Sequence, residues 1–153
     1  MHSRRKSREF LLQSLYARAT RGGEFDRDEF IEAYFSGENR IDLEKSYVDA
    51  VETSLIEHEA ELLSIVSALA PKFELSTLPV LHILIIMIAL TEMRYAKDQD
   101  IPEAVAVNEA IELAKRFSDD GGREFVNGVL SSYMKEKEKK FEEKEDFRIF
   151  GAE

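Results

Sequence analysis

The sequence predicts an all-α protein, and three observations support this fold class. Apolar residues recur every three or four positions in six separate segments, which is the spacing of one face of an α-helix. Glycine or proline stands near the ends of most of these segments, where helices start or stop. No pair of short alternating segments is joined by a hairpin turn. A chain of 153 residues suits one domain or two small helical sub-bundles.

The first two helices are expected over residues 4–20 and 26–35. The first stops at Gly22-Gly23, and the second ends at Gly37, a residue type that is common just after a helix. Their inward faces carry Leu11, Leu12, Leu15 and Ala19 in the first helix and Phe30, Ile31, Tyr34 and Phe35 in the second.

A single long helix is expected from about residue 41 to Pro71, because its apolar residues alternate steps of three and four. Proline cannot continue a helix, so Pro71 ends it. His58 falls on the apolar stripe, where a partly buried histidine that bonds a neighbouring group is the expected role. The stripe consists of Val48, Val51, Leu55, His58, Leu62, Ile65 and Leu69.

The segment 78–96 contains the most apolar run of the chain, residues 81–88. Its β-branched residues resemble a buried strand, but the segment is too long for a strand and is expected to be a helix with Pro79 in its first turn. A helix that is apolar on every side is enclosed by other helices, so this one is placed at the centre. His82 lies in this run and is expected to be a satisfied core histidine.

Two more helices are expected, over residues 103–117 and from about Arg123 to Met134, with a break at Gly121-Gly122 between them. The inward residues are Val107, Ala110, Ile111, Ala114 and Phe117 in the first, and Val126, Val129, Leu130 and Tyr133 in the second.

The composition changes after Met134, so the chain is divided into a helical domain, 1–134, and a charged C-terminal extension, 135–153. Residues 135–146 contain five lysines and six acidic residues, which fits either a solvated helical extension or a disordered tail. Phe147, Ile149 and Phe150 are expected to return to the bundle.

The charge is distributed unevenly. The net charge is −10, yet residues 1–21 hold six cations and one anion, a net charge of +5. An acidic protein repels nucleic acid, whereas a basic end on an acidic body indicates a local site for a polyanion. A solvated, solubilising terminus is the alternative.

The chain carries no recognisable catalytic motif, and it is expected not to be an enzyme and to need no cofactor or metal. It has no cysteine, and His2, His58 and His82 lack the spacing of metal ligands. No phosphate-binding glycine loop or nucleophile motif occurs. No apolar segment has the length of a signal-peptide core or a membrane span, so a cytoplasmic protein without membrane contact is expected.

Three stretches together resemble the NusB family of bacterial transcription antitermination factors. They are the basic start Arg4-Arg5-Lys6-Ser7-Arg8-Glu9 with Gln13-Ser14-Leu15-Tyr16 after it, the segment from Ile101-Pro102 through Asn108-Glu109-Ala110-Ile111-Glu112-Leu113-Ala114-Lys115-Arg116-Phe117, and Phe125-Val126-Asn127-Gly128-Val129-Leu130. The resemblance covers residues 4–134, roughly, and the second and third stretches are specific.

The resemblance implies seven helices in two three-helix sub-bundles, for which a short helix near residues 72–76 would complete the set. It also implies an adaptor that binds boxA, a short single-stranded RNA, together with the ribosomal protein NusE. Such an assembly acts with RNA polymerase in the antitermination complex and supports the transcription of ribosomal RNA. Some family members are homodimers that cover the RNA surface, and the sequence leaves this alternative open.

The resemblance also assigns roles to individual residues. The RNA-binding residues that it implies are Arg4, Arg5, Lys6 and Arg8, which match the arginine-rich start that contacts phosphates, and Phe125, which matches an aromatic residue beside the RNA. Guanidinium groups suit this task because they bind phosphate through two hydrogen bonds. Tyr16 matches a tyrosine at the protein-partner surface.

Several positions depart from the family pattern, among them Met87, Thr91, Gly121 and Glu124, and they are expected to alter partner and RNA affinity more than fold. The departures at Met87, Thr91 and Glu124 motivate one alternative function, a helical protein–protein adaptor whose RNA binding has lapsed. NusB-like domains also precede rRNA cytosine methyltransferases, so a detached targeting module of such an enzyme is a second alternative.

Overall fold

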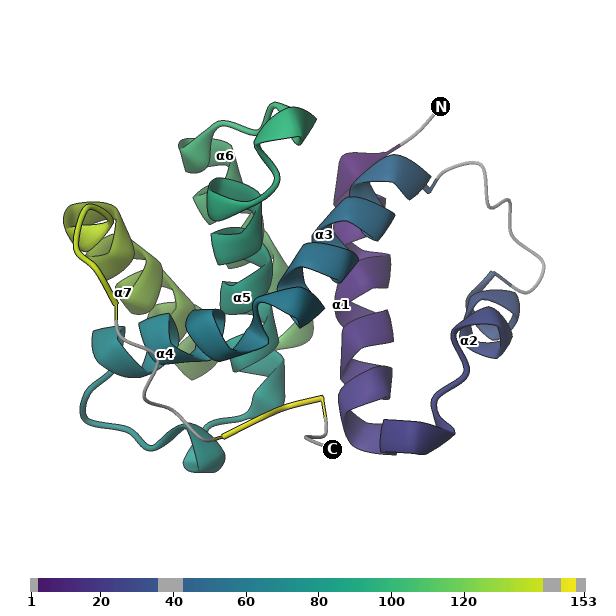
Figure 1. Ribbon diagram of the computed structural model, residues 1–153, viewed down its shortest axis with the longest axis horizontal. Helices are drawn as coiled ribbons and strands as arrows, with labels where there is room; N and C mark the ends of the chain where they lie inside the picture. The colour runs from purple at the N-terminus through teal and green to yellow at the C-terminus, as the bar shows by residue number, and fades with distance from the viewer. Residues whose placement is uncertain (1–2, 36–42, 142–146, 151–153) are drawn as a thin grey trace.

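A computed structural model describes residues 3–35, 43–141 and 147–150, and within these ranges the chain forms seven α-helices and no β-strand (Figure 1). A single bridge pairs Ser3 with Leu43. Short 3₁₀ turns η1 (Gly22–Glu24), η3 (Leu75–Thr77) and η4 (Lys97–Gln99) lie between helices. The helices are α1 (Arg4–Arg21), α2 (Arg27–Tyr34), α3 (Lys45–Glu57), α4 (Glu59–Leu69), α5 (Val80–Arg94), α6 (Glu103–Phe117) and α7 (Asp120–Glu136). The predicted all-α fold class is confirmed.

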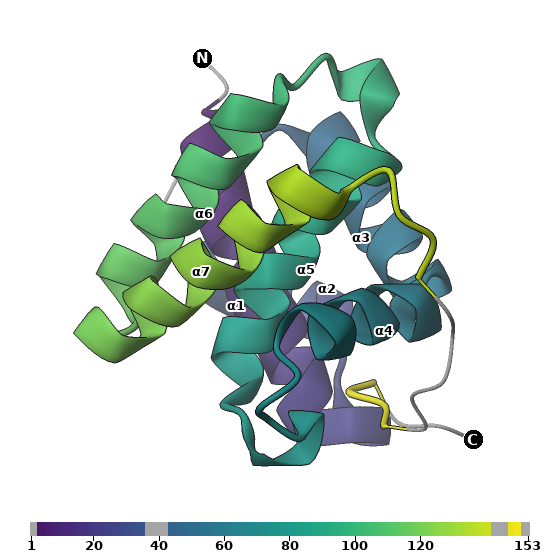
Figure 2. The same ribbon diagram turned by 90° about the vertical axis from the view of Figure 1, so that its left-hand side faces the viewer.

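Helix α5 is the centre of the molecule, as its apolar run predicts. Every residue from Ile83 to Met93 is buried, because α1 and α3 pack on one part of α5 and α4, α6 and α7 on the rest (Figure 2). The groups α1–α3–α5 and α5–α6–α7 are each mutually packed, so the two three-helix groups share α5. Helix α2 lies on the side of α1 opposite α6 and α7 (Figure 1). It contacts α1 through the ring of Phe10, which packs on Tyr34 with a centroid separation of 5.1 Å.

The prediction of one long helix ending at Pro71 is wrong, because the chain bends at His58 between α3 and α4. The backbone of His58 leaves helical geometry (φ −105°, ψ 24°), although its N–H still bonds the carbonyl of Ser54 at 2.9 Å. Its imidazole Nδ1 also contacts that carbonyl, and the ring stacks on Tyr95 at a centroid distance of 3.8 Å. A side chain that competes for a helical carbonyl is a known cause of a kink. The seventh helix therefore comes from this break and not from residues 72–76, which form a turn and the start of η3 (Leu75–Thr77).

The predicted start of the last helix at Arg123 is also wrong, because α7 begins at Asp120 and contains both glycines of Gly121-Gly122 in its first turn. The Asp119 carboxylate caps the helix by accepting a 2.8 Å hydrogen bond from the N–H of Gly122. This cap satisfies an otherwise unbonded first-turn N–H, so the glycines do not interrupt the helix. Gly122 instead allows a close approach, since a Cβ there would lie 2.4 Å from His82 Nε2.

The described part of the C-terminal extension contacts the bundle. Ile149 is buried, and the N–H groups of Ile149 and Phe150 donate to the Glu59 carboxylate at the start of α4, at 2.5 and 3.1 Å. The expected return of Phe147, Ile149 and Phe150 is thus confirmed, since all three pack against the core. Helix α7 ends at Glu136, so it includes the first two residues of the extension. Residues 142–146 of the charged run lie outside the described residues. Among the helices that the structure describes, none combines the length and apolarity needed to cross a bilayer.

Candidate functional site

The start of α1 is fixed to the chain segment that precedes α3, and this contact positions the predicted basic cluster. The Ser3 hydroxyl caps α1 by accepting a 3.1 Å hydrogen bond from the N–H of Lys6. The buried Ser7 hydroxyl donates to the Ser3 carbonyl at 2.8 Å and accepts from the N–H of Glu44 at 2.7 Å. The first turn of α1, which carries the cations, is therefore held in place by short polar contacts.

Arg8 lies inside the protein. Its side chain is 4% exposed, and its Nε and Nη2 donate to the two oxygens of Glu92 on α5 at 2.7 and 2.8 Å. The hydroxyl of Tyr47 on α3 donates to the same carboxylate. Burial, followed by the charge of Glu92, raises the pKa of Tyr47 well above its usual value. Arg8 thus joins α1 to α5 and α3 beneath the surface, and its predicted contact with RNA stays a prediction.

Arg4 and Arg5 are closer to the surface, and each is paired with a carboxylate. The Nε of Arg4 donates to Glu44 at 2.9 Å, and its Nη1 donates to the backbone carbonyl of Gln99 at 3.2 Å. Arg5 donates to both oxygens of Glu109 on α6 at 3.0 and 2.7 Å, a hydrogen-bonded pair that lowers the pKa of Glu109. The Arg5 side chain is 60% exposed, compared with 29% for Arg4. Lys6 is exposed on the same turn.

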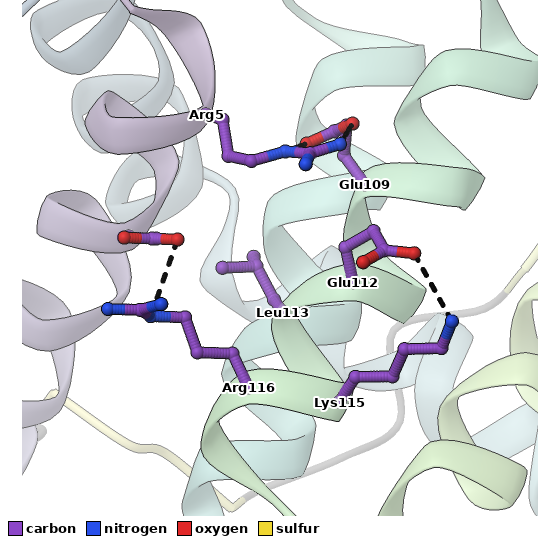
Figure 3. Close-up of a pocket in the computed structure, with 7 residues that line it drawn as sticks. Arg5, Glu109, Glu112, Leu113, Lys115 and Arg116 are labelled. Carbon is purple, nitrogen blue, oxygen red and sulfur yellow. Dashed lines mark hydrogen bonds and ion pairs between the residues drawn. The ribbon is translucent and has the colours of Figure 1, made fainter.

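A cleft of about 330 Å³ lies between α1 and α6, directly beside Arg5 (Figure 3). Its cations are Arg5, Lys115 and Arg116, and its floor includes the buried Leu113. Lys115 and Arg116 were missing from the residues that the sequence predicted. Their spacing on α6 was readable from the sequence, but their position opposite α1 depends on tertiary packing. The remaining lining residues are Glu9, Glu109 and Glu112.

Phe125 lies on α7, away from the basic cluster. It is half-buried, and its ring meets that of Phe73 edge to face at a centroid distance of 5.6 Å. Both rings line a groove of about 250 Å³ between α7 and the segment after α4. This groove and the α1–α6 cleft share no lining residue, so the structure does not bring Phe125 together with Arg5.

Tyr16 is exposed, with 44% of its surface accessible, at the edge of a further groove of about 560 Å³. Aromatic rings from α2 and the end of α6 form its apolar wall, and polar groups of α1 form its rim. Tyr16 and Arg5 are separated by about 16 Å along α1, at 1.5 Å per residue. The groove is lined by Gln13, Tyr16, Ala17, Thr20, Arg21, Phe30, Tyr34, Leu81 and Phe117.

Two of the positions that depart from the family pattern belong to the core. Met87 and Thr91 are completely buried in α5, and the Thr91 hydroxyl donates to the Met87 carbonyl at 2.7 Å. Because neither side chain reaches the surface, any effect on partner affinity would pass through packing. Gly121 and Glu124 are exposed on the first turns of α7, next to Phe125.

Comparison with known proteins agrees with the helical architecture. The profile of the NusB family matches residues 5–135. A transcription antitermination protein NusB of Limosilactobacillus fermentum is 36% identical over 128 residues, which cover 83% of this chain and 89% of that protein. Its counterpart in Lacticaseibacillus casei is 33% identical over 135 residues, covering 88% and 96%, and that of Elusimicrobium minutum is 34% identical over 140 residues, covering 90% and 96%. The chain therefore belongs to the NusB family of transcription antitermination proteins.

Proposed function

We propose that this protein is a non-enzymatic, cytoplasmic RNA-binding adaptor that binds boxA-type single-stranded RNA together with the ribosomal protein NusE during rRNA transcription. Family membership supports the antitermination role. The observation that carries the RNA-binding part is the exposure of Arg5 and Lys6 on the first turn of α1, beside a cleft with two further cations. This site provides cations for a polyphosphate on a protein whose net charge is −10.

The basic residues divide into two roles in this proposal. Arg5 and Lys6 contact phosphates directly, because their side chains reach solvent. Arg4 reaches the surface partly and contributes once its pair with Glu44 rearranges. Arg8 holds α1 in position through Glu92, so its effect on RNA binding in the folded protein is indirect.

The groove at Tyr16 is the proposed surface for NusE. An exposed tyrosine at the edge of an aromatic groove is a common anchor in protein interfaces, since it supplies apolar area and a polar group. This groove is separate from the basic cleft, so the protein can hold RNA and a protein partner at the same time. Phe125, beside Phe73, offers a ring on which an unpaired base can stack.

The alternative function, a protein-binding adaptor without RNA binding, is favoured by one specific observation. Arg4, Arg5 and Arg8 each bond a carboxylate within the chain. These carboxylates cancel part of the positive field that would attract a polyanion. The alternative predicts that the protein does not bind boxA RNA, and that its affinity for NusE is changed neither by RNA nor by Arg5→Ala.

The test is a fluorescence anisotropy titration of labelled boxA RNA, with and without NusE, at several salt concentrations. If Arg4, Arg5 and Lys6 each neutralise one phosphate, log affinity falls against log salt with a slope of about −2, and Arg5→Ala reduces that slope by about 0.7. Phe125→Leu lowers affinity about tenfold without changing the slope, because it removes a stacking ring and no charge. Absence of RNA binding in the presence of NusE would refute the RNA-binding function.

A further inference from the structure

The α1–α6 cleft contains equal numbers of cations and carboxylates, and every cation is paired. Arg5 bonds Glu109, Arg116 Nε lies 3.4 Å from Glu9, and Lys115 Nζ lies 3.4 Å from Glu112. Figure 3 shows Arg5 and Arg116 between α1 and α6, and the Glu112–Lys115 pair on the side of α6 that faces away from α1 in this view. All three cations line the cleft, one from α1 and two from α6. The cleft is thus an assembled cation site whose formal charge is cancelled by its own carboxylates.

The cations of these pairs are at the surface. The side chains of Arg5, Lys115 and Arg116 are 60%, 49% and 65% exposed. Exposed ion pairs are weak, because water screens the charges and both side chains lose freedom. Both side chains of the Lys115–Glu112 pair are exposed, so exchanging Glu112 for an incoming phosphate has a small cost there. Glu109 and Glu9 are only 16% and 17% exposed, so releasing Arg5 and Arg116 from them costs more unless another cation stays close. Arg8, which is 4% exposed and bonded to both oxygens of Glu92, cannot exchange in this way.

Glu109 can release Arg5 without becoming an unpaired buried charge. Its side chain is 16% exposed, so isolation would be unfavourable, but Arg8 Nη1 lies 3.6 Å from the same carboxylate. Arg8 keeps Glu109 compensated when Arg5 turns toward solvent. The Glu112 carboxylate is 44% exposed and can be solvated by water after Lys115 leaves it.

We propose that the α1–α6 cleft binds RNA phosphates through Arg5, Lys115 and Arg116, and that the cleft carboxylates occupy these cations in the free protein and are displaced by the RNA. The inference rests on the RNA-binding function proposed above and extends it from α1 to α6. The carboxylates compete with phosphates for the cations, so they lower the affinity for any polyanion. A polyanion that displaces several carboxylates at once is favoured over one that displaces a single carboxylate.

The salt dependence separates this arrangement from binding by the start of α1 alone. Adding Lys115 and Arg116 to Arg4, Arg5 and Lys6 changes the expected slope of log affinity against log salt from about −2 to about −3.5. A slope near −2 in the wild-type protein would show that α6 takes no phosphate.

The chain offers a matched control for Lys115. The pair Glu136–Lys139 at the end of α7 has the same i,i+3 spacing as Glu112–Lys115, and its lysine is 64% exposed, but it lies outside the cleft. Lys115→Ala is expected to lower the affinity for labelled boxA RNA about threefold and to reduce the slope by about 0.7, whereas Lys139→Ala changes neither. Equal effects of the two substitutions would overturn the cleft as the binding site.

The displacement of carboxylates is tested with Glu112→Gln and Glu136→Gln, which remove carboxylates of nearly equal exposure, 44% and 45%. Glu112→Gln is expected to raise RNA affinity about threefold, and Glu136→Gln to leave it unchanged. The gain should disappear in Lys115→Ala/Glu112→Gln, because no lysine is left to be released. A gain that persists in the double variant would show a general charge effect and refute displacement.

These outcomes are distinct from failure of the proposed function. If the wild-type protein binds RNA with a slope that Arg5→Ala reduces, but Lys115→Ala and Glu112→Gln behave like their controls, the function stands and the cleft inference falls. If the wild-type protein does not bind RNA, both are wrong. Thermal unfolding of each variant at one pH checks that the fold is unchanged.

Discussion

Arg8 and Glu92 form a bidentate ion pair that is closed off from solvent, with exposures of 4% and 1% for the two side chains. The pair links α1, at the edge of one three-helix group, to α5, which both groups share. The Tyr47 hydroxyl completes the coordination of the carboxylate. The most enclosed residue of the basic cluster therefore has a structural task, which is to fix the helix that presents the others.

Replacing Arg8 should destabilise the protein strongly. Arg8→Ala leaves the Glu92 carboxylate buried without its cation, a change that typically lowers the free energy of unfolding by about 3–5 kcal/mol. Urea unfolding at neutral pH, followed by circular dichroism, measures this loss. Arg21→Ala, at the exposed end of the same helix, serves as the control and should change the free energy by less than about 0.5 kcal/mol. Similar losses in both variants would contradict the assigned role of Arg8.

The Arg5–Glu109 pair should make stability depend on acid pH. The hydrogen bond from Arg5 lowers the pKa of Glu109 below its usual value of 4.5 in the folded protein. The unfolded chain therefore takes up a proton first as the pH falls, so the stabilisation is complete above pH 4.5 and is lost as the pH drops through the lower folded pKa. Melting temperatures between neutral pH and acid should decline less steeply in Glu109→Gln than in the wild type.

Arg5→Ala provides the check on that prediction. It removes the bond that lowers the Glu109 pKa, so it should flatten the acid limb of the melting profile much as Glu109→Gln does. The double variant should be no flatter than either single variant. Additive flattening would assign the pH dependence to other contacts of the two residues.

Gly122 should not accept a side chain, whereas Gly128 on the same helix should. A Cβ at Gly122 would lie 2.0 Å from the Ser118 hydroxyl oxygen and 2.4 Å from His82 Nε2, two atoms that are 2.5 Å apart. Gly122→Ala must displace both side chains and should lower the free energy of unfolding by about 1–3 kcal/mol. At Gly128 nothing lies within 4 Å, so Gly128→Ala should stabilise α7 by about 0.5–1 kcal/mol. Thermal denaturation distinguishes the two, and a neutral Gly122→Ala would rule out the close contact.

Tyr16→Ala should weaken the binding of NusE without affecting the fold. Tyr16 is 44% exposed, so its removal changes little in the free protein, but an interface anchor loses at least about fivefold in affinity when truncated. Isothermal titration of NusE in the absence of RNA measures the effect. Val105→Ala is the matched control, because Val105 is an apolar residue of α6 with 41% exposure that lies outside the Tyr16 groove. An equal response of both variants would place the partner elsewhere.

The sequence predicted helices well where local spacing alone decides them. Helix α6 has the predicted bounds, 103–117, because its apolar period and its flanking Pro102 are both local signals. The break at His58 was missed because its stacking partner, Tyr95, follows α5 and comes close only in the folded protein. A periodic stripe continues across a one-residue bend, so the pattern gave no warning.

The candidate site shows the same difference between features set by local sequence and features set by tertiary contacts. The basic residues of α1 were recognisable as a group, but their separate surroundings depend on carboxylates far along the chain. Arg8 meets Glu92, and Arg5 meets Glu109, through contacts that no local pattern encodes. The sequence therefore identifies the cluster of basic residues, but it does not distinguish the buried guanidinium of Arg8 from the exposed one of Arg5.

The distance along the chain between these partners has a consequence for synthesis on the ribosome. The bonds of Arg8 and Arg5 span 84 and 104 residues, so α1 leaves the ribosome before the partners that lock it in place. Contacts of long sequence separation form late, because the intervening loop must close before they contribute. Until Glu109 has left the exit tunnel, Arg5 of the nascent chain lacks this partner while ribosomal RNA surrounds it, and completion of α6 brings the carboxylate into position.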